Sequence, residues 1–284
     1  MAAWKNAPEQ NAPERGVVGR AGNASAFDLC RWPPTAEAAR FVEHFWSVTW
    51  DRREAGPFES TVITFPAMHL TREWGDDVVR HGHRLPSTLL HGVVPKVFRI
   101  TISGRGGVVG ARFRPGGFTA RFGGDAAAMT GRVAPVDDEL LGGPVILGED
   151  VDIAGARLDA TIAASKAPLD ETYRALVPLI DRMRDDPSLH RVEQVMALAP
   201  WSTRTTQRVF RRYVGVTVKW VLCRYRLQQA ALEIESSPGV DFADLAVRLG
   251  WYDQAHFIND SRSMLGSTPG EYAVQNGHAK AAEQ

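Results

Sequence analysis

The stretch from Trp201 to Leu232 constrains the fold of this chain more than any other. It contains seven basic residues and no Asp or Glu, although the net charge of the whole chain is zero. At the 3.6-residue period of an α-helix, one face of its first half is apolar and the opposite face is basic or amide-bearing. The inward face comprises Thr206, Val209, Phe210 and Tyr213, and the outward face comprises Arg204, Gln207, Arg208 and Arg211. The sequence therefore predicts a short helix with a buried stripe and a basic exposed surface.

Composition limits the classes to which the chain can belong. With 284 residues and 44% hydrophobic content, it is long enough for two domains, each with a core. Cys30 and Cys223 are the only cysteines, which disfavours a disulfide framework and a cysteine-rich zinc site. The sequence shows neither an apolar run typical of a signal peptide nor one long enough to span a membrane. We therefore expect a soluble, cytoplasmic protein with no membrane association.

Short runs of aromatic and β-branched residues, separated by turn residues, dominate the first half of the chain. The runs span 45–50, 60–65, 97–104 and 106–115, and the turn material includes 55–57, 73–76 and 103–107. A small apolar face over Thr35–His44 favours one short helix. Short strands without long helices between them predict an antiparallel barrel or sandwich, cupin-like, over residues 26–140.

Irregular segments flank this β-rich part. Residues 1–25 are rich in Ala, Asn, Pro and Gly, and we expect a disordered tail there. Residues 141–169 alternate Gly- and Pro-bearing loops with short apolar pieces, which is typical of a connector between domains. Within that connector, Asp152–Ala164 has a loose helical period. Residues 277–284 form a second tail.

Polar clusters in the β-rich part raise the question of a metal or anion site. Four histidines lie in or beside the expected strands: His69, His81, His83 and His91. On a strand, His81 and His83 would share a face, as the His-x-His pair of a cupin metal site does. No Glu follows His83 at close spacing, so we interpret these as surface or loop histidines and predict no metal, cofactor or catalytic residue. Arg112 and Arg114 would also share a face, where they could hold an anion, although solvation is favoured.

From Asp170 onward the pattern is helical. Asp170–Arg184 is the first expected helix, which Pro178 should kink or shorten. A compact helix over 192–198 leads through a tight turn to Ser202, the expected N-cap of the basic helix. Gly215 has the position of its C-cap glycine. A helix, a short turn and a second helix with a polar outward face form a helix-turn-helix arrangement.

A second unit repeats this pattern after a long helix over about 217–235. Asp241 precedes an apolar-striped helix that ends near Gly250, and Asp253 precedes a helix over 254–265. A last short helix continues through Tyr272. We therefore expect residues 170–276 to be an all-α domain of two helix-turn-helix units, and the fold class of the whole chain to be α+β.

These motifs resemble the AraC/XylS-type DNA-binding domain over some 90 residues. The matching positions are Ser202-x-Arg204-x-x-Gln207-Arg208-x-Phe210, Gly215-Val216-Thr217, Arg224-x-Arg226-Leu227-x-x-Ala230, Leu245-Ala246-x-x-Leu249-Gly250-Trp251-x-Asp253-Gln254-x-His256-Phe257 and Gly266-x-x-Pro269-x-x-Tyr272. The β-rich half is also similar to a sensor domain found with one branch of these regulators. The residues that carry this similarity lie at 41–46 and at Gly110–Gly116.

The resemblance implies which residues contact DNA. In the first recognition helix the matching outward positions are Thr203, Arg204, Gln207 and Arg208, whose side chains suit guanine and adenine edges. Arg211, Arg212 and Lys219 are better placed for phosphates. In the second unit the candidates are Gln254, His256 and Asn259. Any single one of these residues could instead belong to a solvated charged surface.

The second unit departs from the family pattern. Asn259 replaces a usual arginine, and Ser261 replaces an aromatic residue that should pack inward four residues after Phe257. From Glu233 to the C-terminus, three basic residues stand against eight acidic ones. We therefore expect the first unit to dominate DNA binding and the second to contribute weakly.

Together these features predict a sequence-specific, effector-responsive transcription regulator that is not an enzyme. Its expected partners are double-stranded DNA, a small-molecule effector in the N-terminal domain, a second copy in a homodimer and, for an activator, RNA polymerase. The main alternative is a cupin-type metalloenzyme using His81, His83 and His91, with an accessory helical domain. A DNA-repair alkyl acceptor would need a cysteine cluster that the chain lacks. A protein-interaction module with a basic face is a further alternative.

Overall fold

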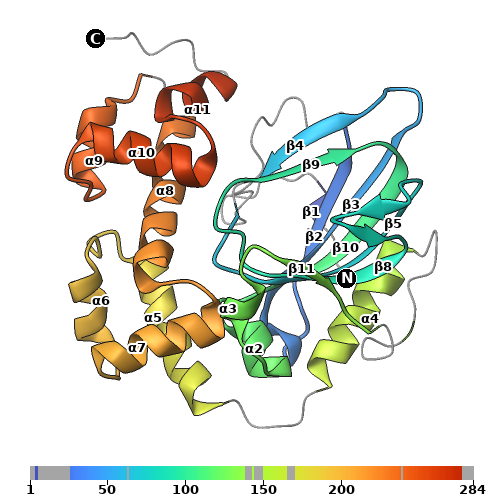
Figure 1. Cartoon of the computed structure of the whole chain (residues 1–284), viewed down its shortest axis with the longest axis horizontal. Helices are drawn as coiled ribbons and strands as arrows, with labels where there is room; N and C mark the ends of the chain where they lie inside the picture. Colours follow the sequence, from blue (N-terminus) through green and yellow to red (C-terminus); the bar gives the residue numbers. More distant parts are fainter. Residues whose placement is uncertain are drawn as a thin grey trace.

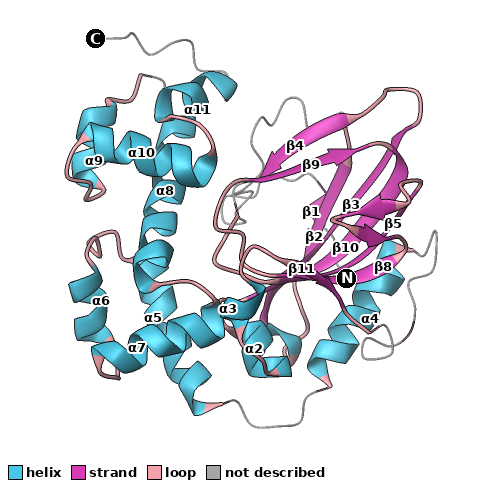
Figure 2. Cartoon of the chain, in the orientation of Figure 1, coloured by secondary structure: helices cyan, strands magenta, loops and turns pink. Residues whose placement is uncertain are grey.

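The computed structural model of the chain has a β-rich N-terminal part and a helical C-terminal part (Figures 1 and 2). It describes residues 4–5, 26–62, 64–137, 143, 150–164, 170–237 and 239–276. The expected tail at 277–284, and that at 1–25 except for residues 4–5, lie outside this set. No helix in the described part of the chain is long and apolar enough to cross a membrane.

A seven-stranded sheet forms the larger wall of the β-rich part. Across the sheet the strands run β1 (Trp4–Lys5), β2 (Asp28–Trp32), β3 (Val42–Arg52), β10 (Gly104–Phe113), β5 (His69–Gly75), β8 (Ser87–His91) and β11 (Val133–Pro135). Two further pairs are β4 (Phe58–Val62) with β9 (Phe98–Ile102), and β6 (Val79–Arg80) with β7 (His83–Arg84). All pairs among the described strands are antiparallel, which confirms the predicted class of fold.

Both faces of the large sheet are covered. Successive residues of a strand point to opposite faces. Phe45 lies in the core on the side where helix α4 (Val151–Ala163) packs, whereas Trp46 lines a cavity on the other side, facing the β4–β9 ribbon. Helix α4 lies so close that a Cβ on Gly155 would come within 2.4 Å of the Trp32 ring.

The strand predictions at 45–50, 60–65, 97–104 and 106–115 overlap with β3, β4, β9 and β10, although β4 already ends at Val62. The helix expected over Thr35–His44 is wrong except for a 3₁₀ turn, η1 (Ala38–Arg40), because Val42–His44 belong to β3. There the chain pairs with β10, and this tertiary pairing overrides a weak helical period.

Two expected turns are also wrong. Residues 73–75 belong to β5 and residues 104–107 to β10. Two glycines of β10 serve close packing rather than turning: a Cβ on Gly106 would lie 2.6 Å from the Trp50 ring, and one on Gly107 would lie 2.3 Å from the Trp74 ring. Glycine within a strand therefore marks a close approach by an indole here.

The helical part follows the predicted order. Its elements are α5 (Glu171–Asp185), α6 (Val192–Leu198), α7 (Thr203–Val209), η3 (Phe210–Val214), α8 (Val218–Ser236), α9 (Phe242–Arg248), α10 (Gln254–Leu265) and α11 (Pro269–Gln275). Helix α5 runs through Pro178 for 15 residues, so the proline does not shorten it. Buried residues on both sides of the proline, including Tyr173 and Met183, hold the two halves in the core.

Two short helices, α2 (Gly117–Phe122) and α3 (Ala126–Met129), follow the large sheet and meet the helical part (Figure 1). One continuous core joins Phe41 and Phe113 of the β-rich part to Tyr173 of α5 and Phe210 of η3. A separate core, built around Leu245 and Phe257 and the second half of α8, supports the second helix-turn-helix unit.

Candidate DNA-binding surface and interior cavity

The first recognition helix is fixed at both ends. The Ser202 hydroxyl accepts a hydrogen bond of 3.3 Å from the backbone N–H of Thr205, as the predicted N-cap should. Helix α7 continues into the π-helical turn η3 and ends at Gly215, whose φ of 90° is left-handed. The four residues predicted to face inward, Thr206, Val209, Phe210 and Tyr213, are all buried. The predicted division of this helix into two faces is thus confirmed.

The predicted DNA-contacting residues of the first unit lie on the surface. Thr203, Arg204, Gln207, Arg208, Arg211, Arg212 and Lys219 are all exposed. Within the described part of the chain, no acidic side chain forms an ion pair with Arg204, Arg208 or Arg211. The outward face therefore offers unneutralised positive charge.

Two arginines of the basic stretch belong to the interior instead. Arg224 is fully buried, and its guanidinium donates to the carbonyl oxygens of Met264 at 3.2 Å and Pro95 at 3.4 Å. Burial lowers its pKa to about 10. Arg226 lies over the Trp251 ring and donates to the Gly250 carbonyl at 2.9 Å, where helix α9 ends. Neither side chain is available to DNA.

The second helix-turn-helix unit lacks the arginine and the inward aromatic residue of the family pattern and has polar contacts in this region. Gln254, His256 and Asn259 are exposed, as a DNA-facing surface requires. Ser261 occupies a buried position, as predicted for the aromatic residue it replaces, and its hydroxyl donates to the Ser267 carbonyl at 2.8 Å. The Asp260 carboxylate accepts a 2.8 Å hydrogen bond from the Trp251 indole and lies 3.5 Å from the His256 ring. An acid therefore adjoins the candidate DNA-facing side chains.

A cavity of about 220 Å³ lies inside the β-rich part, between the large sheet and the β4–β9 ribbon. Most of its wall is apolar, including Val48, Val62 and Ile100. The sequence did not reveal this cavity, because its lining comes from alternate residues of strands that pair far apart in the chain. Six of its polar side chains form two groups.

The first group brings together Arg112, His44 and His69. Arg112 is 7% exposed, forms a 3.0 Å ion pair with Glu43 and lies over the Phe65 ring. Burial, followed by the charge of Arg112, lowers the pKa of His69 to about 3 and that of His44 well below its ordinary value. Both imidazoles are therefore neutral at pH 7, and His69 Nδ1 accepts a 3.2 Å hydrogen bond from the Trp46 indole.

The expectation that Arg112 and Arg114 are solvated is therefore wrong. The second arginine is half-buried and donates to the Ala39 carbonyl at 3.0 Å. Both faces of β10 are covered in the fold, so Arg112 faces the cavity, and Arg114, just after β10, contacts the segment that precedes β3.

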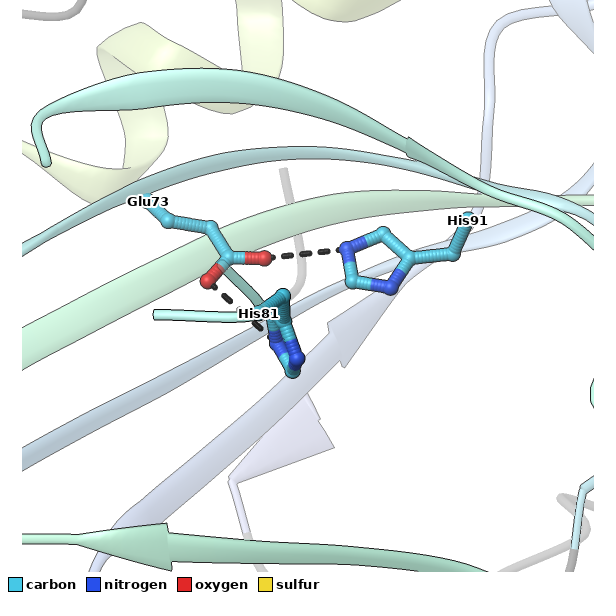
Figure 3. A group of neighbouring side chains, drawn as sticks. All are labelled: Glu73, His81 and His91. Atoms are coloured by element: carbon cyan, nitrogen blue, oxygen red, sulfur yellow. Dashed lines mark hydrogen bonds and ion pairs between the residues drawn. The ribbon is translucent and has the colours of Figure 1, made fainter. Parts of the chain in front are cut away.

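The second polar group comprises Glu73, His81 and His91, which point toward one another from three different segments (Figure 3). The Glu73 carboxylate lies 3.0 Å from His91 Nε2 and 3.8 Å from His81 Nε2. Burial favours the neutral acid, but the hydrogen bond from His91, the electrostatic interactions with His91 and His81, and the hydrogen bond from Thr71 together outweigh it and lower the pKa of Glu73 to about 2. Burial lowers the pKa of His81 to about 4.

The expected His-x-His pair does not form. His81 lies in the turn between β6 and β7 rather than on a strand, and the His83 ring lies 3.2 Å from the Val133 carbonyl, outside this cluster. The carboxylate comes from Glu73, eight residues before His81 rather than after His83. Pairing β5 with β8 in the sequence could have identified this carboxylate. That pairing sets His69 opposite His91 and places Glu73, four residues after His69, on the same face of the sheet.

The rim of the β-rich part contacts the long helix α8 and the second helix-turn-helix unit. The Trp220 indole and Arg224 both donate to the Pro95 carbonyl, and Gln228 donates to the Thr64 carbonyl at 3.4 Å. Where α10 ends, a Cβ on Gly266 would come within 2.9 Å of Val97. Helix α8 and the second unit thus lie directly against the loop that follows β8.

Comparisons with known proteins agree with this arrangement. Residues 197–275 match the family described as "Helix-turn-helix domain", and residues 31–135 match a "Domain of unknown function (DUF6597)". No curated protein matches the chain. Among solved structures, ToxT from Vibrio cholerae O395 is 10% identical, covers 83% of this chain and 99% of its own, and has a TM-score of 0.41. An unsaturated fatty acid-bound wild-type ToxT from strain SCE256 is also 10% identical, covers 91% and 94%, and has a TM-score of 0.37. The C-terminal part of this chain is therefore a helix-turn-helix DNA-binding domain, joined to an N-terminal domain of unknown function.

Proposed function

We propose that this DNA-binding protein is an effector-responsive transcription regulator that reads the major groove mainly with its first recognition helix. One observation carries the proposal. Arg204, Gln207 and Arg208 project from a helix whose opposite face is anchored in the main core, so a rigid support presents them to DNA. An arginine can bind guanine O6 and N7 together, and a glutamine can bind adenine N6 and N7.

The remaining basic residues of this unit supply affinity without sequence information. Arg211, Arg212 and Lys219 are exposed beside the reading face, where phosphates would lie. The second unit contributes less, because Asp260 adjoins its candidate contacts and its sequence is acidic overall. Gln254, His256 and Asn259 are its proposed contacts.

Binding of full-length protein to the DNA upstream of its own coding region tests this assignment. Arg208→Ala should weaken binding by about 1–3 kcal/mol, which is the usual cost of one base-reading arginine. Asn259→Ala should have a clearly smaller effect. Arg53→Ala, which removes an exposed arginine from the β-rich part, is the control and should bind as the wild type does. Equal losses from the first two variants would contradict the proposal.

The cavity is the proposed effector site. Its apolar wall suits the body of a small molecule, and the buried Arg112 suits an anionic group. Thr64, Gly92 and Val94 line the cavity next to the carbonyls that hold α8, so filling the cavity would shift the support of both units.

Fluorescence of anilinonaphthalene sulfonate, an apolar ring system with one anionic group, tests the effector site. Val48→Trp should fill the cavity and weaken binding of the dye at least about tenfold, since a bulky side chain would occupy its volume. Val247→Trp, at a position 65% exposed on α9, is the control for added surface tryptophan. Equal dye binding by the two variants would rule out the cavity as the site.

Homodimer formation, and contact with RNA polymerase if target genes are activated, are also part of the proposed function. Sedimentation of the full chain with and without its DNA tests the first. A single protomer on one DNA site would contradict a dimeric mode of binding.

A further inference from the structure

We propose that Glu73, His81 and His91 bind a divalent transition-metal ion on the wall of the interior cavity. The carboxylate comes from β5, one imidazole from the turn between β6 and β7, and the other from the end of β8 (Figure 3). This proposal does not depend on how the protein reads DNA.

The distances among the three side chains suit one ion. One ligand atom from each residue lies within 4.8 Å of the other two, and the closest pair is Glu73 Oε1 with His91 Nε2 at 3.0 Å. Metal bonds of about 2.0–2.2 Å place neighbouring ligand atoms roughly 3–3.5 Å apart. The first pair already has this spacing, and a small side-chain rotation would bring His81 Nε2 to it.

The backbone conformation at His81, which fixes the position of this imidazole, costs conformational free energy. His81 and Gly82 form the two-residue turn between Arg80 and His83, and both have positive φ, of 53° and 81°. Such turns favour Asn, Asp or Gly at the first position, and the left-handed conformation costs any residue other than glycine some free energy. The turn places the ring edge-on to His91, with centroids 4.9 Å apart, and beside Phe98.

Neighbouring groups orient the carboxylate. Thr71 donates to Glu73 Oε1 at 2.8 Å, and its hydroxyl lies 3.0 Å from His91 Nε2. Arg80 is the competing cation, because its guanidinium lies 3.4 Å from Glu73 Oε2. That guanidinium also reaches Asp77 at 3.3 Å and lies over the Trp50 ring, so it keeps a partner when Glu73 turns to a metal.

The donor set indicates the class of ion. Two imidazole nitrogens and one carboxylate favour zinc, iron(II), cobalt or nickel over magnesium and calcium, which prefer oxygen ligands. All three residues line the cavity, so the remaining coordination positions face its interior. There a water molecule, or an anionic group of a bound small molecule, would complete the coordination.

Metal binding by tag-free, full-length protein tests the proposal. After treatment with a chelator and desalting, the protein is titrated with Co²⁺ and followed by visible absorption, and elemental analysis measures retained Zn²⁺. We expect about one ion per chain, with at least about tenfold weaker binding in His81→Asn. Asparagine suits the left-handed turn, so this variant should fold.

Two further variants separate the possible outcomes. His83→Asn, two residues away and outside the cluster, should bind Co²⁺ as the wild type does. Arg208→Ala should also bind Co²⁺ as the wild type does. A loss of DNA binding can therefore be told apart from a loss of metal binding. Wild-type protein that takes up no Co²⁺ or Zn²⁺ at micromolar concentrations, or a His81→Asn variant that binds Co²⁺ as tightly as the wild type, would overturn the proposal.

Discussion

The hydroxyl of Thr130, just after α3, donates a 2.7 Å hydrogen bond to the carbonyl oxygen of Gly215, where the first recognition helix ends. A side chain of the β-rich part is thus hydrogen-bonded to the backbone at the end of the first recognition helix. Thr119 of α2 adds a second, longer contact to the Tyr213 carbonyl at 3.4 Å. The orientation of the recognition helix is therefore coupled to the two short helices that follow the large sheet.

Gly215→Ala should destabilise the protein more than an ordinary substitution at a left-handed glycine. A Cβ at this position would lie 2.8 Å from Thr130 Oγ1 and 2.9 Å from the Ala126 carbonyl oxygen. The left-handed backbone alone costs roughly 1–2 kcal/mol for a non-glycine residue. Gly239→Ala is the matched control, since its φ is 81° and nothing lies within 4 Å of its Cβ. Denaturant unfolding should show the larger loss of unfolding free energy for Gly215→Ala. Equal losses would mean that α3 moves away from the new Cβ without a measurable cost.

Arg224→Ala should lower the free energy of unfolding by about 2–4 kcal/mol, because it leaves a buried void and unpaired carbonyls. Arg208→Ala should change it by less than about 0.5 kcal/mol, since that side chain is exposed. The two substitutions remove the same side chain from one basic stretch and differ chiefly in burial. Chemical denaturation of both variants measures the difference, and similar losses would contradict the interior role of Arg224.

DNA binding should weaken steeply with salt. Five to seven phosphate contacts predict a log–log slope of about −4 to −6 for the affinity against salt concentration. Arg212→Ala should reduce the magnitude of this slope by about 1, while Gln207→Ala should leave it unchanged because a neutral side chain releases no counterion. A slope near zero in the wild type would instead favour a protein-interaction surface.

Acid should destabilise the fold through His44. Burial, helped by Arg112 and Arg31, holds its pKa well below the ordinary value of 6.5. The unfolded chain gains a proton on this imidazole below that pH while the folded chain does not, so the contribution is complete above pH 6.5 and lost as the pH falls toward the folded pKa. His44→Gln should therefore flatten the loss of stability between neutral pH and about pH 5, by up to about 2 kcal/mol. Unfolding at a series of pH values measures this, and parallel curves would exclude His44 as the cause.

The helical half was predictable from sequence because its signals are local. Ser202 and Asp253 cap their helices as their positions in the sequence indicated, and Gly215 ends one. Burial at position 261 was predicted as well, since it follows from the spacing to Phe257. The hydrogen bond that makes a serine acceptable there depends on Ser267, which only the fold brings close.

The interior of the β-rich half was not predictable in the same way. Glu73 looked like part of a turn, and Arg112 looked like a surface residue, because strand pairing decides both positions. The register of β5 against β8 sets Glu73 opposite Ser87, on the same face of the sheet as His91, and the side chains of Glu73 and His91 meet at 3.0 Å. Alternation within one strand predicts two faces, but it does not reveal that a second ribbon covers one of them.

The two hydrophobic cores of the chain do not correspond to one β-rich core and one core shared by both helix-turn-helix units. The first recognition unit shares its core with the β-rich part, whereas the second unit has its own core on the later half of α8. In folding terms, the chain should therefore open in two cooperative units, with the second helix-turn-helix unit able to unfold while the first stays native. Amide hydrogen exchange would then be faster in α9 and α10 than in η3. A fragment beginning at residue 170 would lose the partners that Phe210 and Tyr173 have in the β-rich part, so the first recognition helix folds together with that part of the chain.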